Sequence, residues 1–516
     1  MKTGLTWNSR WILGGALALA VVALLALVLV PRLRGPEQRP APDDWPTQGW
    51  RSSTPEEQGF DSAKLAEGLL AIREQNISIH SLMLIRNGSV FLDAYFYPYD
   101  GSTYHDLASV TKSVMTSLIG IAATQGKLDL DAPMVSFFPN RTIANRDARK
   151  ERITVRHLAS MSSGLDCTEA DNERTLRQMW ASRDWVQFAL DRPVAWEPGT
   201  HWVYCGPGMH LLSAILQQAT GMTTLEYARE NLFKPLGIHE VDWPADPQGY
   251  ARGWGDLALH PRDAAKLGYL WFNQGNWDGQ QIVSREWVTK STMGYFSGTG
   301  RKEDYGYGWW VAPADENPNY FLAAGRGGQR IQVFAEGNLI IVTTGGGFEF
   351  DQVGPYLEAA IGDPTKALPA NPAGVAELNV ALATIVRGPA PQPVAPLPAS
   401  AQAISGKTFV FAPNPGQLRS LRLDLNASAE ATVQLDLANE ASPRLMGVGL
   451  DGVYRPSRGG RPILARGQWT DASTFVLECD EGPGLNLYTL RMRFEGNRVS
   501  LEIPGQGSIE GRLQNP

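Results

Sequence analysis

Residues 105–113 read HDLASVTKS, and this short stretch governs how the rest of the chain is interpreted. Ser109 and Lys112 form the only Ser-x-x-Lys motif in the sequence. Apolar residues recur at helical spacing from here to Thr124, which predicts a helix over 109–124. A serine in the first turn stands at the positive end of the helix dipole, and a lysine three residues later shares its face. The spacing alone is compatible with a nucleophile and its base, but it slightly favours a capping serine beside a solvated lysine.

Further segments extend the pattern across residues 55–365. They read ITVRHLASMSSGL at 153–165, EPGTHWVY at 197–204, HPRD at 260–263, YGW at 307–309 and AAGRGGQ at 323–329. With residues 105–113, they resemble the serine β-lactamases and penicillin-binding proteins. The resemblance is strongest to the class C-type branch, which includes carboxylesterases, D-aminopeptidases and 6-aminohexanoate-dimer hydrolases. It implies an α+β, β-lactamase/transpeptidase-like domain over 55–370, in which an antiparallel sheet is flanked by helices beside an all-helical region.

The resemblance also implies catalytic roles. Ser109 would be the acylated nucleophile, and Lys112 with Tyr204 would form the base that removes its proton. A phenol alone is a poor base, but a nearby ammonium favours the phenolate, so the two groups are treated as one titrating unit. The backbone N–H groups of Ser109 and Arg326 would form the oxyanion hole.

The third motif would supply substrate contacts from Ala324, Gly325 and Arg326, with the Arg326 guanidinium either binding a substrate carboxylate or staying solvated. Two departures from the family pattern stand out. Gly206 replaces the Asn of a Tyr-x-Asn motif, and Ala323 replaces a Lys or His. Both missing groups help to hold a β-lactam, so the departures argue against penicillin hydrolysis. They favour an esterase or small-amide hydrolase, and no GxSxG elbow offers another serine.

Three classes of function therefore stay open at this stage. The first is a serine hydrolase that acts on a small-molecule ester or amide through an acyl-enzyme. The second is a cell-wall D,D-peptidase of the penicillin-binding type. The third is an inactive binding module with the same fold. None of them requires a cofactor, and the sequence does not indicate the oligomeric state.

The chain has 3 cysteines, with neither a CxxC nor an HExxH signature, so no metal site is predicted. In the family that the sequence resembles, the segments that carry Cys167 and Cys205 line the cleft. This placement suggests a disulfide between them if the domain is exported, and two buried free thiols otherwise. Cys479 would be left over as a buried thiol.

The N-terminal region carries an apolar run from Trp11 to Val30, flanked by basic residues on both sides. A helix of about twenty residues spans the hydrocarbon core of a bilayer. The run ends without a small-x-small cleavage site, which favours an uncleaved anchor over a signal peptide. We therefore expect a single-pass anchor in the cytoplasmic (inner) membrane at 1–34 and a tether at 35–54. The catalytic domain would lie on the exported, periplasmic or extracellular side.

The remaining features set the outline of the chain. A net charge of −7 over 516 residues argues against nonspecific nucleic-acid binding. A helix is predicted over 62–75, and strands are predicted within 81–96, 329–334 and 338–343, with the early and late strands in one sheet. Residues 371–403 are partly Pro/Ala-rich and predict a linker. Residues 404–516 alternate with period two, which predicts a small antiparallel barrel or sandwich.

Overall fold

The computed structural model describes residues 44–514 except for 168–173, 315–318, 415, 426–428, 439–441, 458–462, 482–485 and 504–506. The predicted membrane anchor at 11–30 lies outside the described residues. Among the residues that are described, no helix is long and apolar enough to cross a bilayer. The anchor therefore stays a prediction.

The first half of the fold is built on a mixed sheet that joins early and late parts of the chain. In the described residues its strands, in spatial order, are β1 (Arg51–Ser52), β3 (Ser89–Tyr95), β2 (Ile79–Arg86), β12 (Leu339–Gly345), β11 (Gln329–Phe334), β10 (Phe321–Gly325), β9 (Trp310–Val311) and β8 (Asp304–Tyr305). β2 pairs antiparallel with β12, with Leu84 opposite Ile341. This pairing confirms that the terminal segments of the predicted domain share one sheet.

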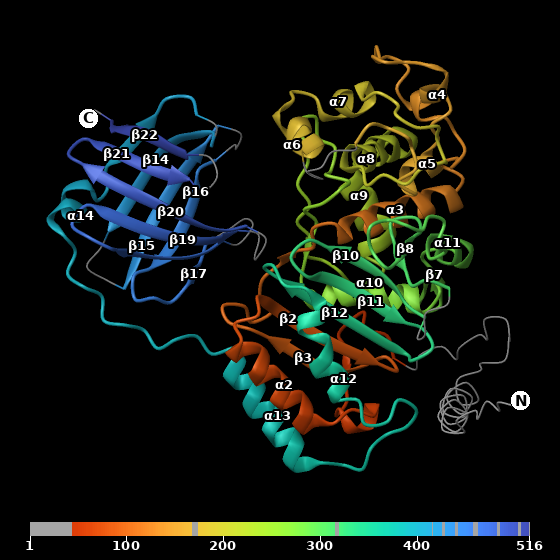
Figure 1. Ribbon diagram of the computed structural model, residues 1–516, viewed down its shortest axis with the longest axis horizontal. Helices are drawn as coiled ribbons and strands as arrows, with labels where there is room; N and C mark the ends of the chain where they lie inside the picture. Colours follow the sequence, from red (N-terminus) through yellow and green to blue (C-terminus); the bar gives the residue numbers. More distant parts are fainter. Residues whose placement is uncertain are drawn as a thin grey trace, which may run out of the picture. The chain divides into compact units, whose positions relative to one another are not determined.

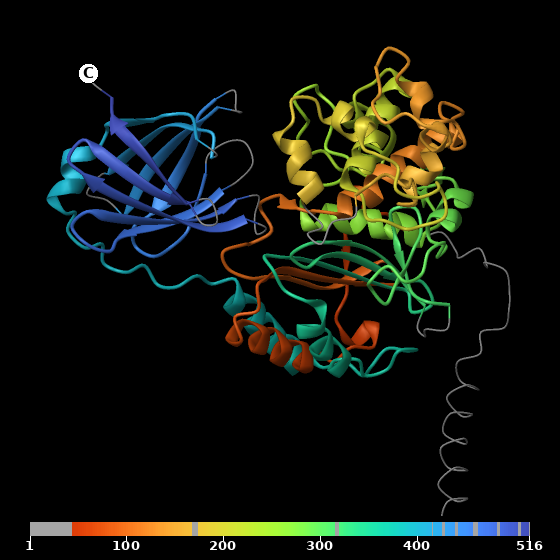
Figure 2. The same cartoon turned by 45° about the horizontal axis from the view of Figure 1, so that its top comes forward.

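Helices cover both faces of this sheet. The described helices of this domain, which include those of the all-helical region, are α2 (Ser62–Glu74), α3 (Val110–Thr124), α4 (Ala148–Glu151), α5 (Val155–Ala159), α6 (Arg174–Ala181), α7 (Trp185–Asp191), α8 (Gly206–Thr220), α9 (Thr224–Ala228), α10 (Pro261–Phe272), α11 (Arg285–Ser291), α12 (Gly354–Ala359) and α13 (Pro372–Ile385). Figures 1 and 2 show α2 and α13 side by side on one face, with α10 against the other. Because both faces are covered, every residue of β2 is buried.

The boundaries of these elements follow from local chemistry. Asp61 begins α2 by accepting hydrogen bonds from the backbone N–H groups of Ala63 and Lys64. The β2–β3 turn falls at Asn87-Gly88, as the sequence predicts. On the other face, α3 and α8 are almost wholly buried, and they form the centre of the all-helical region. Short strands β4 (His105–Asp106) and β5 (Ala258–Leu259) pair beside it.

The C-terminal residues form a closed barrel. Its described strands, in spatial order, are β16 (Arg444–Gly449), β15 (Glu430–Leu437), β14 (Leu418–Leu425), β13 (Thr408–Phe411), β22 (Gly507–Leu513), β21 (Arg498–Ile503), β20 (Asn486–Glu495), β19 (Thr474–Glu481), β18 (Ile463–Trp469) and β17 (Arg455–Pro456). A parallel pairing of Gly449 with Arg466 joins β16 to β18 and closes the sheet (Figure 2). Alternate residues such as Leu421 and Leu423 point inward, so the period-two pattern marks the barrel core.

Two helices lie within residues 371–403, the segment predicted as a linker, or begin in it. Residues 372–385 form α13, whose Leu378, Ala381 and Ile385 are buried in the same apolar core as α2. A second helix, α14 (Ala399–Ile404), buries Ala401 and Ile404 in the barrel core. The helical periodicity of 372–385 was obscured by the Pro/Ala-rich composition that follows it.

Buried imidazoles connect the sheet to the strand that precedes Ser109. His80 of β2 lies with its Nδ1 atom 2.9 Å from Nε2 of His105, whose Nδ1 is 2.8 Å from the carbonyl oxygen of Asp106. Two neutral rings satisfy this chain: His105 donates to the carbonyl and His80 donates to His105. Burial, and secondarily the neighbouring His105, holds the pKa of His80 well below its usual value.

This arrangement predicts acid sensitivity at mildly acidic pH. When the folded-state pKa of a histidine lies below its unfolded value of about 6.5, the unfolded chain binds more protons as the pH falls. The free energy of unfolding should therefore decrease between pH 7.5 and 5.5, by up to about 1.4 kcal/mol per pH unit for each such histidine. Urea unfolding at both pH values, in wild type and His80→Gln, measures the change. An unchanged pH dependence in the variant would contradict this assignment.

Candidate active site

Ser109 lies at the N-terminus of α3, but its hydroxyl group does not cap the helix. The residue occupies the N-cap position, but its side chain makes no hydrogen bond to the first helical turn. The Oγ atom instead lies 2.8 Å from the Nζ atom of Lys112, which donates to it. Since Lys112 is only 3% exposed, the alternative of a capping serine with a solvated lysine does not describe this structure.

The turn that presents Ser109 has an unusual backbone. Ala108 has φ 46°, a left-handed conformation that typically costs a residue with a Cβ about 1 kcal/mol or more. Local hydrogen bonds hold it in place. The Ala108 N–H donates to Asp106 Oδ1 at 2.7 Å, and its carbonyl accepts from Thr111 Oγ1 at 2.6 Å. The sharp turn is therefore fixed from both sides, and Ser109 projects into a cleft.

Lys112 is buried, and its hydrogen-bond partners are both oxygen atoms of uncharged groups. Besides Ser109 Oγ, the amine donates to the carbonyl oxygen of Trp254 at 2.6 Å. In the described part of the chain it makes no ion pair with a carboxylate. The amine also lies 4.7 Å from the centroid of the Tyr204 ring. The structure therefore brings together the three residues for which catalytic roles are predicted.

A buried pair supports the tryptophan that holds this amine. The His210 ring contacts Trp254 edge-on with centroids 5.1 Å apart, and its Nε2 atom is 3.0 Å from Asp246 Oδ2. Burial lowers the pKa of His210, although the Asp246 carboxylate acts in the opposite direction. Asp246 in turn accepts backbone hydrogen bonds from Gln248 and Tyr250. The Trp254 side chain thus packs against the buried His210–Asp246 pair.

Tyr204 lies at the start of α8 among aromatic side chains. Its ring stacks on Trp310 with centroids 6.3 Å apart and an interplanar angle of 21°. Trp202 packs against both rings. Cys205 then caps α8 by accepting a hydrogen bond from the Gly208 N–H to its Sγ atom at 3.4 Å. These contacts fix where the phenol stands relative to Lys112.

A cavity of about 990 Å³ opens over these groups. Every residue for which a catalytic or substrate-binding role is predicted lines it, namely Ser109, Lys112, Tyr204, Ala324, Gly325 and Arg326. Sequence reasoning missed a second group of lining residues, namely Leu176, Trp180, Trp254, Arg301 and Arg330. Trp202 and Trp310 adjoin recognisable motifs and offered a signal, whereas Leu176, Trp180 and Trp254 lie in segments without a motif.

The charged side chains that line the cavity are mostly basic: four are Lys or Arg, against the two carboxylates of Asp256 and Glu349. Arg301 stacks over the Trp310 ring at 4.7 Å and pairs with Glu303 at 3.2 Å. Arg330 stacks over Phe350 at 4.2 Å, and burial lowers its pKa to about 10. The Arg330 guanidinium therefore stays protonated at neutral pH, and the excess of basic side chains favours a neutral or anionic substrate over a cationic one.

The segment 323–329 can pack against the turn before Ser109 because residue 325 is a glycine. A Cβ atom at Gly325 would lie 2.5 Å from the Leu107 carbonyl oxygen and 3.0 Å from Ala108 Cβ. Without a side chain, the end of β10 packs directly against the turn that precedes Ser109. The Arg326 backbone follows immediately, which is the position predicted for the second oxyanion donor. That role stays a prediction.

Comparison with known proteins identifies the family. A family model described as Beta-lactamase matches residues 63–362. The chain belongs to the beta-lactamase family. The resemblance inferred from residues 105–113 and the segments that follow is thereby confirmed.

Curated relatives of this beta-lactamase-family protein include hydrolases of more than one kind. Beta-lactamase of Escherichia coli K12 is 25% identical over 194 residues, which is 36% of this chain and 49% of that protein. Esterase EstB of Burkholderia gladioli is 24% identical over 227 residues, 39% of this chain and 58% of that protein. The chain thus spans less than two thirds of the length of these relatives.

Two solved structures to which this chain is similar are matched over nearly their whole length. One is the octameric penicillin-binding protein homologue from Pyrococcus abyssi, with a TM-score of 0.48, 17% identity and coverage of 86% of this chain and 99% of the other. The second is a family VIII carboxylesterase, with a TM-score of 0.48, 17% identity and coverage of 60% and 98%.

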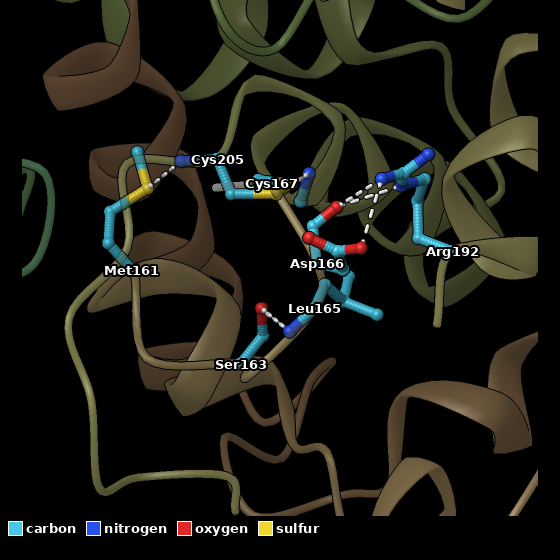
Figure 3. The surroundings of a disulfide bond; sticks show 8 residues. Met161, Ser163, Leu165, Asp166, Cys167, Arg192 and Cys205 are labelled. Carbon is cyan, nitrogen blue, oxygen red and sulfur yellow. Dashed lines mark hydrogen bonds and ion pairs between the residues drawn. A yellow bond between two sulfur atoms is a disulfide. The ribbon is translucent and has the colours of Figure 1, made fainter. Parts of the chain in front are cut away.

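Cys167 and Cys205 are joined in the structure. Their Cα atoms are 5.4 Å apart, and the bond spans a sequence separation of 38 (Figure 3). Figure 3 also shows the Cys205 N–H directed at Met161 Sδ, at 3.3 Å, and the Arg192 guanidinium donating to the Asp166 carbonyl oxygen. The residue after Tyr204 is therefore tied to a second wall of the cleft. Cys479 is buried in the barrel and lies outside this disulfide.

We expect a side chain at position 325 to disrupt the site, because Gly325 packs directly against the turn before Ser109. Gly325→Ala should cost about 1–3 kcal/mol of stability, because the added methyl group meets backbone on a turn that cannot move without disturbing Ser109. Turnover of a simple ester should fall at least tenfold. Gly337→Ala is the matched control, since its Cβ would meet nothing closer than 3.8 Å. Equal activity of the two variants would refute the close-approach argument.

The disulfide should contribute measurably to stability. Closing a loop of this length predicts a loss of about 2–4 kcal/mol in the free energy of unfolding when the bond is removed. Urea unfolding of the oxidised protein, the reduced protein and Cys167→Ser measures it. Reduction should not destabilise Cys167→Ser further. Alkylation under denaturing, non-reducing conditions should modify only Cys479 in wild type, and modification of all three cysteines would contradict the assignment.

Proposed function

We propose that this protein is a serine hydrolase that cleaves an ester or a small amide through an acyl-enzyme on Ser109. The observation that carries the proposal is the 2.8 Å hydrogen bond between Lys112 Nζ and Ser109 Oγ inside a cavity that Tyr204 also lines. A serine hydroxyl needs an adjacent base to become nucleophilic. The buried amine and the phenol next to it are the groups that can supply one.

The reaction would proceed in two balanced halves. Ser109 Oγ attacks the substrate carbonyl carbon while its proton passes to the Lys112/Tyr204 pair. The bond to the leaving group then breaks, and the same proton is delivered to the departing oxygen or nitrogen. A water molecule attacks the acyl-enzyme, gives its proton to the pair, and releases the acid as the proton returns to Ser109. Throughout, backbone N–H groups at Ser109 and Arg326 would stabilise the oxyanion.

An ester or small amide fits the site better than a β-lactam does. Ala323 is fully buried, and Gly206 has no side chain, so neither position offers a polar group to the cavity. The polar groups missing from the sequence motifs are therefore not replaced at these two positions, and similarity to an esterase is consistent with this. We also propose that the domain is exported and anchored through residues 11–30, a setting in which disulfides persist.

A fluorophosphonate probe tests the proposed nucleophile. The full-length protein in detergent should gain one adduct by intact mass, and turn over p-nitrophenyl acetate, while Ser109→Ala should do neither. Lys112→Met should slow acylation by about 10²–10⁴-fold, which is the usual contribution of a positioned base. Ser136→Ala, at an exposed serine, is the matched control and should behave as wild type.

The other outcomes have equally definite meanings. Labelling that persists in Ser109→Ala would show that another residue is the nucleophile. Stable acylation of Ser109 by penicillin would favour the D,D-peptidase alternative. A folded wild-type protein that neither labels nor turns over an ester would indicate a binding module.

A further inference from the structure

The wall of the cavity around Gly206 is apolar, although the family pattern often places a polar side chain at this position. At Gly206, a Cβ atom would lie 3.2 Å from Leu176 Cδ1 and 3.8 Å from Trp254 Cβ. Gly206 is the position at which the family pattern often carries an asparagine amide. In this chain the neighbouring space is taken by a leucine and a tryptophan, which offer no hydrogen bond to a substrate. This side of the cleft is thus adapted to an apolar group.

Helix α6 builds that wall and is well anchored. Leu176 and Trp180 are four residues apart, so they project from one face of the helix and both line the cavity. Met179 and Thr175 are buried on the inner side of α6. The position of the wall is therefore set by packing against the helical region.

Trp180 leaves apolar surface uncovered in the cavity that Ser109 also lines. Its side chain is 41% exposed, although its ring centroid is 6.3 Å from that of the buried Trp254. Tryptophan with one face packed and the other exposed in a concave site is typical of residues that bind a ligand. The cavity has further aromatic lining, because Trp202 and Trp310 line it in contact with Tyr204.

We infer that Leu176, Trp180 and Trp254 form an apolar subsite that makes this protein selective for esters with a bulky apolar substituent next to the scissile bond. The inference rests on the proposed function and adds the substrate class. The substituent would be a medium-length alkyl or arylalkyl group. It lies against α6 when the carbonyl carbon is at Ser109 Oγ. The same subsite disfavours peptide-like substrates, whose amides would lose their hydrogen bonds to water there.

Two series of esters test the subsite in the full-length protein. The first varies the acyl group, from p-nitrophenyl acetate to p-nitrophenyl hexanoate. The second varies the alcohol, from ethyl acetate to hexyl acetate. Full burial of one methylene is worth about fourfold in kcat/KM, so partial burial of four should raise it at least tenfold in one series. The series that shows the increase identifies whether the acyl or the alcohol group occupies the subsite.

Variants connect the preference to the named residues. Trp180→Ala should reduce the long-to-short ratio of kcat/KM by about tenfold, and the exposure of Trp180 makes the substitution tolerable to the fold. Leu176→Ala should shift the optimum toward larger substituents, because it widens the wall at Gly206. Met293→Ala, at an exposed apolar residue outside the cavity, should leave the ratio unchanged. A ratio in Trp180→Ala equal to that of wild type would overturn the inference.

Failure of the inference can be told from failure of the proposed function. If both ester series are flat while Ser109 is still labelled by fluorophosphonate, the hydrolase proposal stands and the apolar subsite is refuted. If Ser109 is not labelled and no ester is turned over, the hydrolase proposal fails and the subsite fails with it.

Discussion

The centre of this structure depends on one constraint, which is that a lysine amine buried in the helical region must have hydrogen-bond partners. Lys112 finds them in the Ser109 hydroxyl and the Trp254 carbonyl oxygen. An unsatisfied amine at this depth would be strongly unfavourable, so both partners have to be held in place. The turn at Ala108 positions the first, and the buried His210–Asp246 pair supports the side chain of the second.

Remote parts of the chain also converge on this point. Tyr204 reaches the amine from the start of α8, and the Cys167–Cys205 bond ties its neighbour to another segment. Gly325 lets β10 approach the serine turn from the sheet side. Each contribution comes from a different element, so the site is a property of the assembled domain and not of any single motif.

Much of this arrangement could be predicted from the sequence, because its parts carry strong local signals. The α3 periodicity, the Asn87-Gly88 turn and the period-two strands of the barrel each reflect one dominant local preference. The motifs around Ser109, Tyr204 and Gly325 supplied the candidate catalytic residues, which the structure brings to one cavity. The part of the cavity wall formed by Trp180 and Trp254 could not be predicted, because these two residues come together only when α6 and a distant loop pack against each other. Helix α13 was missed because its apolar face looks like part of a composition-biased linker until α2 is placed beside it.

The pairing of β2 with β12 has a consequence for how the protein is made. β2 is complete within the first hundred residues, but the strand that covers its open edge ends at Gly345. During synthesis, the backbone N–H and C=O groups along this edge of β2 therefore stay without their native partners until more than two hundred further residues have been made. The catalytic domain cannot mature progressively from its N-terminus; it has to be kept soluble as a nascent chain and then close in a late, long-range step.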